Sequence, residues 1–200
     1  MLSTHAVFVD RDGTLIREVG YLARQDQIEL LPRVPEAIRL LQSHGLKVVM
    51  ITNQSAVARG IINEQQLHKI HREIERALDQ GGAYLDGLYY CPHHPTEGTY
   101  PYRVSCGCRK PQPGLVERAC LDLGLDSRVS YVIGDQMSDM ELAARTGATG
   151  ILIESQTSRG GRSGGKRDEP PFVPVADFWT ATRRIVQHHI GKGTLQERCN

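Results

Sequence analysis

Apolar positions along the chain fall into short continuous runs separated by longer amphipathic segments. The runs have strand length and are rich in β-branched residues, as in strands buried on both faces of a sheet. They cover residues 7–9, 46–51, 129–133 and 150–153. The segments between them space their apolar residues at helical intervals and cover residues 35–44, 63–78, 113–123 and 140–145. This alternation predicts an α/β fold, a Rossmann-like parallel sheet with helices on both faces.

Polar residues mark the ends of several predicted elements. Asn63 is a suitable N-cap for the long helix that follows it. His68 and His71 lie on that helix and are interpreted as solvated residues. Near the end of the chain, residues 172–175 form a predicted edge strand, and Asp177 is expected to cap a terminal amphipathic helix.

Composition and charge narrow the picture. With 200 residues and 40% apolar content, the chain is expected to form one domain over residues 1–200. Its 24 basic and 23 acidic residues nearly balance, so we expect it to bind neither nucleic acid nor membranes. We also expect a monomer. No apolar run approaches the roughly 20 residues of a membrane span, and no signal peptide is evident, which predicts a cytoplasmic location. The Gly-rich, basic residues 155–170 are expected to form a flexible surface segment.

The first apolar run ends in two carboxylates, Asp10 and Asp12, followed by Gly13. Ligands bind at the carboxyl ends of strands in α/β proteins, and glycine permits a tight turn of the backbone there. Two carboxylates one residue apart can divide catalytic work, one ionised as nucleophile or metal ligand and the other protonated as donor. An acidic turn without a catalytic role explains this stretch equally well, so both interpretations stay open.

The second apolar run is followed at once by Thr52, Asn53, Gln54 and Ser55. Two hydroxyls and two amides at the end of a strand can donate hydrogen bonds to an anion. A capping turn before the next helix is the alternative interpretation and carries the same weight.

Three cysteines and a histidine lie within residues 91–108. Cys91, His93, Cys106 and Cys108 form a set that suits a structural, four-coordinate zinc ion, with His94 as a substitute for His93. A redox-active cysteine pair is the rival interpretation, and the additional cysteine and histidine at matching spacing favour metal over it.

Two cations, Arg109 and Lys110, come directly after this loop. A metal that pins the loop would therefore position both cations at the mouth of the site. Two further cysteines stand apart from the cluster: Cys120 is assigned to a helix core and Cys199 to the tail.

Together these motifs resemble the haloacid dehalogenase (HAD) superfamily of aspartate-nucleophile phosphatases. The resemblance rests on motifs that occur in order over residues 5–153: Asp10-Arg11-Asp12-Gly13-Thr14, Thr52, Lys110, and Gly134-Asp135 with Asp139. The run Cys-Pro-His-His-Pro and the long insert before Cys106 are similar, within the superfamily, to the D-glycero-D-manno-heptose 1,7-bisphosphate 7-phosphatase family. This resemblance implies a HAD-like fold; the gaps between motifs leave no room for a large cap domain.

The resemblance also implies catalytic roles. Asp10 is the expected nucleophile, which forms an aspartyl-phosphate. Asp12 is the expected general acid and base. Thr52 and Lys110 are expected to stabilise the charge on the transferred phosphoryl group.

Two metals follow from the same resemblance. A catalytic Mg²⁺ is expected to bind the carboxylates of Asp10 and Asp135 and the main-chain carbonyl of Asp12, with Asp139 just outside these ligands. A structural Zn²⁺ is expected in the Cys₃His set, where four protein ligands leave no position for a reacting water.

The implied substrate is a small sugar bisphosphate. Arg109 is the best candidate to hold its far phosphate, because a guanidinium binds phosphate through two parallel hydrogen bonds. By resemblance, the remaining substrate-binding residues are Glu18, Val19, Gly20, Tyr21, Thr52, Asn53, Gln54, Ser55, Lys110 and Gln136.

Other functions remain open at this point. A histidinol-phosphate phosphatase would use the same chemistry on a different substrate. A polynucleotide 3′-phosphatase would need a basic groove, which the balanced charge disfavours. A non-catalytic, zinc-stabilised binding module would leave the enzyme-like motifs unused, although every catalytic position is filled.

Overall fold

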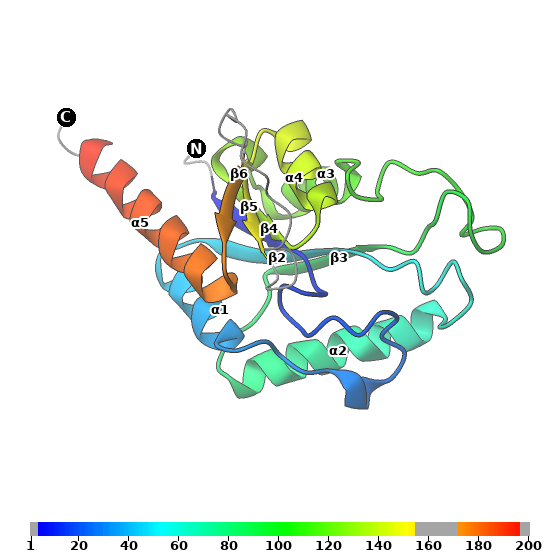
Figure 1. The fold of residues 1–200 in the computed structure, drawn as a ribbon. Helices are drawn as coiled ribbons and strands as arrows, with labels where there is room; N and C mark the ends of the chain where they lie inside the picture. Colours follow the sequence, from blue (N-terminus) through cyan, green and yellow to red (C-terminus); the bar gives the residue numbers. More distant parts are fainter. Residues whose placement is uncertain (1–3, 155–171, 197–200) are drawn as a thin grey trace, which may run out of the picture.

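The computed structural model describes residues 4–154 and 172–196, and a parallel β-sheet forms its centre (Figure 1). Its six strands are β1 (Ala6–Val9), β2 (Lys47–Asn53), β3 (Gly87–Cys91), β4 (Tyr131–Gly134), β5 (Thr149–Ile153) and β6 (Phe172–Val175). They lie in the order β3-β2-β1-β4-β5-β6, and every neighbouring pair is parallel. The predicted α/β fold is therefore confirmed, and so is the predicted edge strand.

Helices cover both faces of the sheet. They are α1 (Val34–Ser43), α2 (Glu64–Gln80), α3 (Gly114–Leu123), α4 (Met137–Thr146) and α5 (Phe178–Gln196), with short 3₁₀ turns η1 (Gln25–Gln27) and η2 (Ser127–Val129). Figure 1 shows α3 and α4 on one face and α1, α2 and α5 on the other. Among the described helices, none combines the length and apolar character that crossing a bilayer requires.

The central strand β1 shows why both faces need cover. Val7 and Val9 pack into the core beneath α1, α2 and α5, whereas Ala6 and Phe8 pack into the core beneath α3 and α4. Side chains alternate between the two faces of a strand, so four consecutive apolar residues serve two cores. The strand is fully buried and places whatever follows it at the carboxyl edge of the sheet.

The starts of α4 and β4 differ from the prediction. Helix α4 begins at Met137, three residues before the expected start, because the backbone amide of Gln136 donates to the Asp139 side chain and closes the first turn. Strand β4 begins at Tyr131, because Ser127–Val129 forms a 3₁₀ turn that the Asp126 side chain caps.

The prediction that His68 and His71 are both solvated is wrong for His71. The ring of His71 is 3% exposed and packs edge-on against Tyr90, with ring centroids 5.5 Å apart. His68 is exposed, as expected. At the start of α5, the Asp177 side chain accepts a hydrogen bond from the Thr180 amide, which confirms the predicted cap. The Gly-rich segment 155–170 and Cys199 lie outside the described residues.

Candidate active site

Three strand ends bring the motif residues to one edge of the sheet. Asp10 directly follows β1, Thr52 lies near the end of β2, and Asp135 directly follows β4. Since β1 lies between β2 and β4, these residues become neighbours although they are far apart in sequence. Lys110 reaches the same edge from the loop between β3 and α3.

Lys110 is a buried cation held between two carboxylates. Its ammonium lies 2.7 Å from Asp10 Oδ1 and 2.7 Å from Asp139 Oδ1, and it donates to the Ile51 carbonyl at 3.2 Å. Burial alone would lower the pKa of Lys110, but the two carboxylates outweigh it and raise the pKa above the usual range. Lys110 is therefore a permanent positive charge beside Asp10.

Three carboxylates crowd this cation. Asp10, Asp135 and Asp139 each offer an oxygen within 4.8 Å of the others. Burial, and then the charge of Asp10, raises the pKa of Asp135 to about 6. Three carboxylates against one ammonium leave an excess of about two negative charges, which a divalent cation with hard oxygen ligands would balance. This carboxylate cluster (Asp10, Asp135 and Asp139) therefore fits Mg²⁺.

Asp139 differs from the other two members of the cluster. Its Oδ1 forms an ion pair with Lys110, and its Oδ2 accepts from the Gln136 amide at 3.2 Å, so both oxygens are already engaged within the protein. Asp135 instead accepts one hydrogen bond, from the side chain of Gln136 at 3.2 Å. This difference favours Asp135 as the direct ligand and Asp139 as the residue that holds Lys110.

Two glycines make room for these carboxylates. Gly13 adopts a left-handed conformation with φ of +70°, and a Cβ placed there would lie 2.2 Å from Asp135 Oδ2. A Cβ on Gly134 would lie 2.1 Å from Asp139 Oδ2. Any side chain at either position would collide with a carboxylate of the cluster.

Asp12 lies beside the carboxylate cluster and is held by separate hydrogen bonds. Both of its oxygens accept from the Arg11 guanidinium, at 2.8–3.1 Å through Nε and Nη2. The Gln54 side chain donates to Asp12 Oδ2 at 3.0 Å and to Thr52 Oγ1 at 2.9 Å. Gln54 is itself buried, so it connects two motif residues from behind.

A polar cavity of about 300 Å³ opens above these groups. Its lining residues are Asp10, Asp12, Glu18, Thr52, Asn53, Arg109, Lys110, Asp135, Gln136 and Ser138. Ser138 is the lining residue that sequence reasoning missed; its signal was a small hydroxyl in the first turn after Asp135. Among the predicted substrate-binding residues, five do not line the cavity: Val19, Gly20, Tyr21, Gln54 and Ser55.

The loop that follows Asp12 reaches this cavity through Glu18. Burial, and then the charge of Asp12, raises the pKa of Glu18 above its ordinary value. The Glu18 carboxylate accepts from the amide of Gly20, which closes a tight turn. Tyr21 turns away toward Arg59, whose guanidinium lies 5.2 Å from the centre of the Tyr21 ring.

Asn53 fixes the backbone of Lys110. Its side chain donates to the Lys110 carbonyl at 3.1 Å and accepts from the Lys110 amide at 3.0 Å. A two-way pairing of this kind holds a peptide unit as a strand neighbour would. The position of Lys110 thus depends on β2 as well as on the loop that precedes it.

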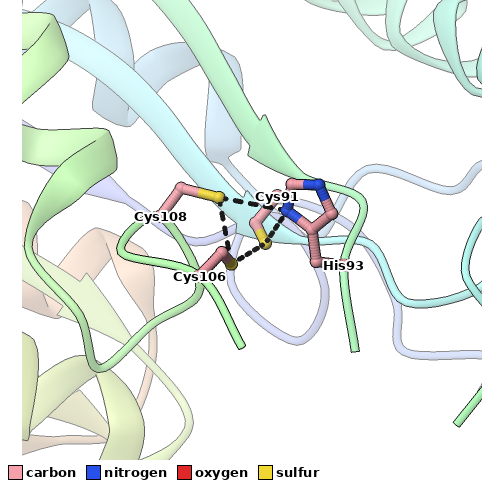
Figure 2. A group of neighbouring side chains, drawn as sticks. All are labelled: Cys91, His93, Cys106 and Cys108. Carbon is pink, nitrogen blue, oxygen red and sulfur yellow. Dashed lines mark hydrogen bonds between the residues drawn. The ribbon is translucent and has the colours of Figure 1, made fainter. Parts of the chain in front are cut away.

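The four predicted zinc ligands converge at the end of β3 (Figure 2). Four contacts link their ligand atoms: Cys91 Sγ to His93 Nδ1 at 3.6 Å, Cys91 Sγ to Cys106 Sγ at 3.5 Å, Cys108 Sγ to His93 Nδ1 at 3.4 Å, and Cys108 Sγ to Cys106 Sγ at 3.3 Å. A tetrahedral zinc ion with Zn–S bonds of about 2.3 Å would hold sulfurs about 3.8 Å apart. The sulfurs lie much too far apart for disulfides, with S–S bonds of about 2.05 Å, so this Cys–His cluster fits zinc.

A hydrogen bond with Cys91 lowers the pKa of the Cys108 thiol to about 5. The same hydrogen bond, followed by burial, raises the pKa of the Cys91 thiol, so Cys108 is the more readily ionised of the two. The thiolate is the form that binds metal.

The Cys–His cluster touches Arg109 through its histidine. Arg109 Nη1 donates to the His93 carbonyl at 3.0 Å, which leaves the remaining N–H groups of the guanidinium for a ligand. A second hollow of about 250 Å³ shares Arg109 and Lys110 with the polar cavity and runs beside Val104, Ser105 and Cys106. Arg109 thus stands between the two hollows.

The chain is similar to known HAD phosphatases. A HAD-hydrolase-like family model matches residues 107–181. The chain is 41% identical to D-glycero-beta-D-manno-heptose-1,7-bisphosphate 7-phosphatase of Haemophilus ducreyi, over 75% of this chain and 83% of that protein. It is 43% identical to the enzyme of that name from Photorhabdus laumondii, over 75% of this chain and 80% of that protein.

Solved structures agree with this similarity. The D,D-heptose 1,7-bisphosphate phosphatase of B. bronchiseptica, solved with magnesium and phosphate, matches with a TM-score of 0.76 and 29% identity over 92% of this chain and 99% of that chain. A HAD-like phosphatase from Mesorhizobium loti matches with a TM-score of 0.80 and 27% identity, over 94% of this chain and 88% of that chain. This chain therefore belongs to the D-glycero-beta-D-manno-heptose-1,7-bisphosphate 7-phosphatase family of the HAD superfamily.

Proposed function

We propose that this chain is a Mg²⁺-dependent phosphomonoesterase that removes the 7-phosphate of D-glycero-D-manno-heptose 1,7-bisphosphate and releases heptose 1-phosphate. The names of the relatives support the substrate. The observation that carries the proposal is the placement of Asp10 beside Lys110 and Asp135, at the floor of a polar cavity.

The proposed nucleophile is Asp10. One of its oxygens bonds to phosphorus while the bond to the sugar oxygen breaks, giving an aspartyl-phosphate and an alkoxide. When bound by Asp10, Asp135 and the Asp12 carbonyl, Mg²⁺ supplies the positive charge that lets an anionic carboxylate approach an anionic ester. Lys110 and Thr52 stabilise the charge spread over the phosphoryl oxygens.

The proposed acid and base is Asp12. In the first step it gives its proton to the departing sugar oxygen, and in the second it takes a proton from the water that attacks phosphorus. The second step breaks the bond between Asp10 and phosphorus, releases inorganic phosphate and returns both carboxyl groups to their starting states.

Recognition of the far phosphate is assigned to Arg109. Its guanidinium stands at the junction of the two hollows, so a substrate with one phosphate at Lys110 can extend its sugar toward the zinc loop. Gln136, Glu18 and Ser138 line the cavity and are proposed as contacts to the sugar or the phosphate. Gln54 is buried behind Asp12, which favours an indirect role for it.

Zinc is proposed to hold this arrangement together through Cys91, His93, Cys106 and Cys108. Because the His93 carbonyl accepts from Arg109, a metal bound to the His93 ring also fixes the acceptor that orients the guanidinium. The ion itself takes no part in the reaction, since its four positions are filled.

The test is a substrate panel with the purified, magnesium-loaded protein. We expect the highest kcat/KM on the heptose bisphosphate, with the β anomer preferred over the α anomer, as the relatives' names suggest. A clear preference for histidinol phosphate would replace the proposed substrate while keeping the chemistry. No phosphate release from any ester by correctly folded protein would instead support the binding module.

A monomeric, single-domain chain that works in the cytoplasm completes the proposal. The balanced charge supports a small-molecule substrate rather than nucleic acid or a membrane surface as the partner.

A further inference from the structure

Arg11 is a buried cation that the proposed reaction does not use. Its side chain is 1% exposed, so it can touch neither substrate nor solvent. Within the described parts of the chain, its ion pair is with Asp12, and the fork of Nε and Nη2 covers both Asp12 oxygens. Burying a guanidinium costs free energy unless its charge is paired. The pairing therefore points to a role for Arg11 that involves Asp12.

Gln54 grips the same carboxylate from another element. Its amide donates to Asp12 Oδ2 at 3.0 Å and to Thr52 Oγ1 at 2.9 Å, and its own side chain is buried. Nε and Nη2 each lie 2.8–3.1 Å from both oxygens, so Arg11 holds the plane of the carboxyl group through four crossed contacts. Gln54 fixes that plane relative to β2, on which Thr52 lies.

We propose that Arg11 and Gln54 are positioning residues that hold Asp12 as a carboxylate aimed at the attacking water. The inference rests on the proposed function, in which Asp12 takes a proton from that water. It adds that proton transfer depends on two buried side chains that never touch the substrate. The alternative is that both residues merely fill and stabilise the core.

The surroundings of Arg11 support this assignment. His71 lies within electrostatic reach of Arg11, and burial followed by the charge of Arg11 lowers the pKa of His71 to about 3. His71 is therefore neutral near pH 7 and adds no second positive charge beside Arg11. The charge of Arg11 is thus left to Asp12.

A double-mutant cycle separates positioning from mere stability. We expect Arg11→Lys to lower kcat on an alkyl phosphate by about tenfold or more, because lysine keeps the charge but cannot fix the carboxyl plane. In an Asp12→Asn background the same substitution should change kcat by less than about threefold. Equal factors in both backgrounds would overturn the inference. Arg128→Lys is the control, since Arg128 also binds both oxygens of an aspartate, Asp126, through Nε and Nη2 but lies on the surface.

Burst kinetics with p-nitrophenyl phosphate give a second readout. Nitrophenolate leaves without needing a proton, so the first burst of product should stay within about threefold of the parent rate in Arg11→Lys, whereas steady-state turnover should fall about tenfold or more. A burst that slows as much as the steady state would mean general damage to the site and would overturn the inference.

Folding is controlled with a second variant. If Arg11→Lys does not fold, Gln54→Met is put through the same cycle and judged by the same two outcomes. Its effect on Thr52 is present in both backgrounds and cancels. Failure of the proposed function would look different, because the parent protein itself would then release no phosphate from either ester.

Discussion

Two polar clusters flank Lys110, and the chain assembles them in different ways. The carboxylate cluster takes its members from the ends of two strands and the first turn of α4, so the sheet itself sets their spacing. The Cys–His cluster takes its members from the end of β3 and a loop without regular structure. The first is held by an ammonium that is already present, whereas contacts between weak donors and acceptors hold the second.

This difference teaches which part of the site needs its metal in order to form. Lys110 is held by Asn53, Asp10 and Asp139, none of which is a zinc ligand, so we expect it to keep its place without zinc. Arg109 depends on the His93 carbonyl, which belongs to the loop that zinc would pin. Removing magnesium should therefore abolish turnover but leave the fold intact. Removing zinc should disorder the loop and weaken binding of the far phosphate.

The largest effect should come from Asp10→Asn, which removes the proposed nucleophile. We expect kcat to fall by about 10⁴-fold or more, because no other carboxylate can take its position at the end of β1. Zinc content, measured by atomic absorption, should stay at the parent level, since the Cys–His cluster is built independently. Turnover at the parent rate by this folded variant would refute the mechanism.

A smaller loss should follow from Lys110→Met. Losing one preorganised cation is expected to lower kcat by about 10²–10³-fold. It also leaves Asp10 and Asp139 facing each other without the ammonium, so the melting temperature should fall and should recover in part when Mg²⁺ is added. Lys47→Met is the matched control, since Lys47 pairs with Asp86 at 3.1 Å away from the site.

Removal of zinc, by chelation or by Cys108→Ser, should mainly weaken binding of the bisphosphate. We expect KM for the heptose bisphosphate to rise about tenfold. The kcat on a small monophosphate ester should change by less than about threefold, because Asn53 and two carboxylates still hold Lys110. Cys120→Ser serves as control, since Cys120 lies in α3 outside the cluster. An equal loss on both substrates would show that the two clusters are not independent.

The smallest effect should come from His71, which is buried in the core and belongs to neither cluster. His71 has a pKa of about 3 in the folded chain, lowered by burial, against about 6.5 when unfolded. The unfolded state binds more protons over this range, so stability is lost as pH falls below about 6.5. Between pH 6.5 and 5 the loss attributable to this ring is about 1.5 kcal/mol. His71→Leu should flatten that part of the pH–stability curve, measured by urea unfolding.

Much of the fold could be predicted because hydrophobic periodicity reports burial directly. The prediction failed in two ways. In one, residue type was given more weight than the helical period; in the other, a side chain capped a helix from three residues away. His71 follows Leu67 at four residues and precedes Ile74 by three, so the helical period already placed it on the buried face; its polar character suggested otherwise. The start of α4 was missed because Asp139 both caps that helix and belongs to the motif.

Within the site, the residue types of the motifs were informative but their partners were not. The sequence places Asn53 next to Thr52, yet its side chain pairs with Lys110, which is 57 positions away. Gln54 appears equally suited to a substrate, but its amide turns inward to Asp12. Side-chain direction at a strand end depends on which element packs behind it, and a single sequence does not encode that choice locally.

Gly13 and Gly134 together set a limit on redesign. Each leaves a space that a carboxylate oxygen already occupies, at 2.2 Å and 2.1 Å from the nearest position a Cβ could take. A library randomised at these two codons should return glycine alone among active clones, whatever change is selected elsewhere. Attempts to change the metal preference of this protein must therefore substitute the carboxylates and keep glycine at both positions.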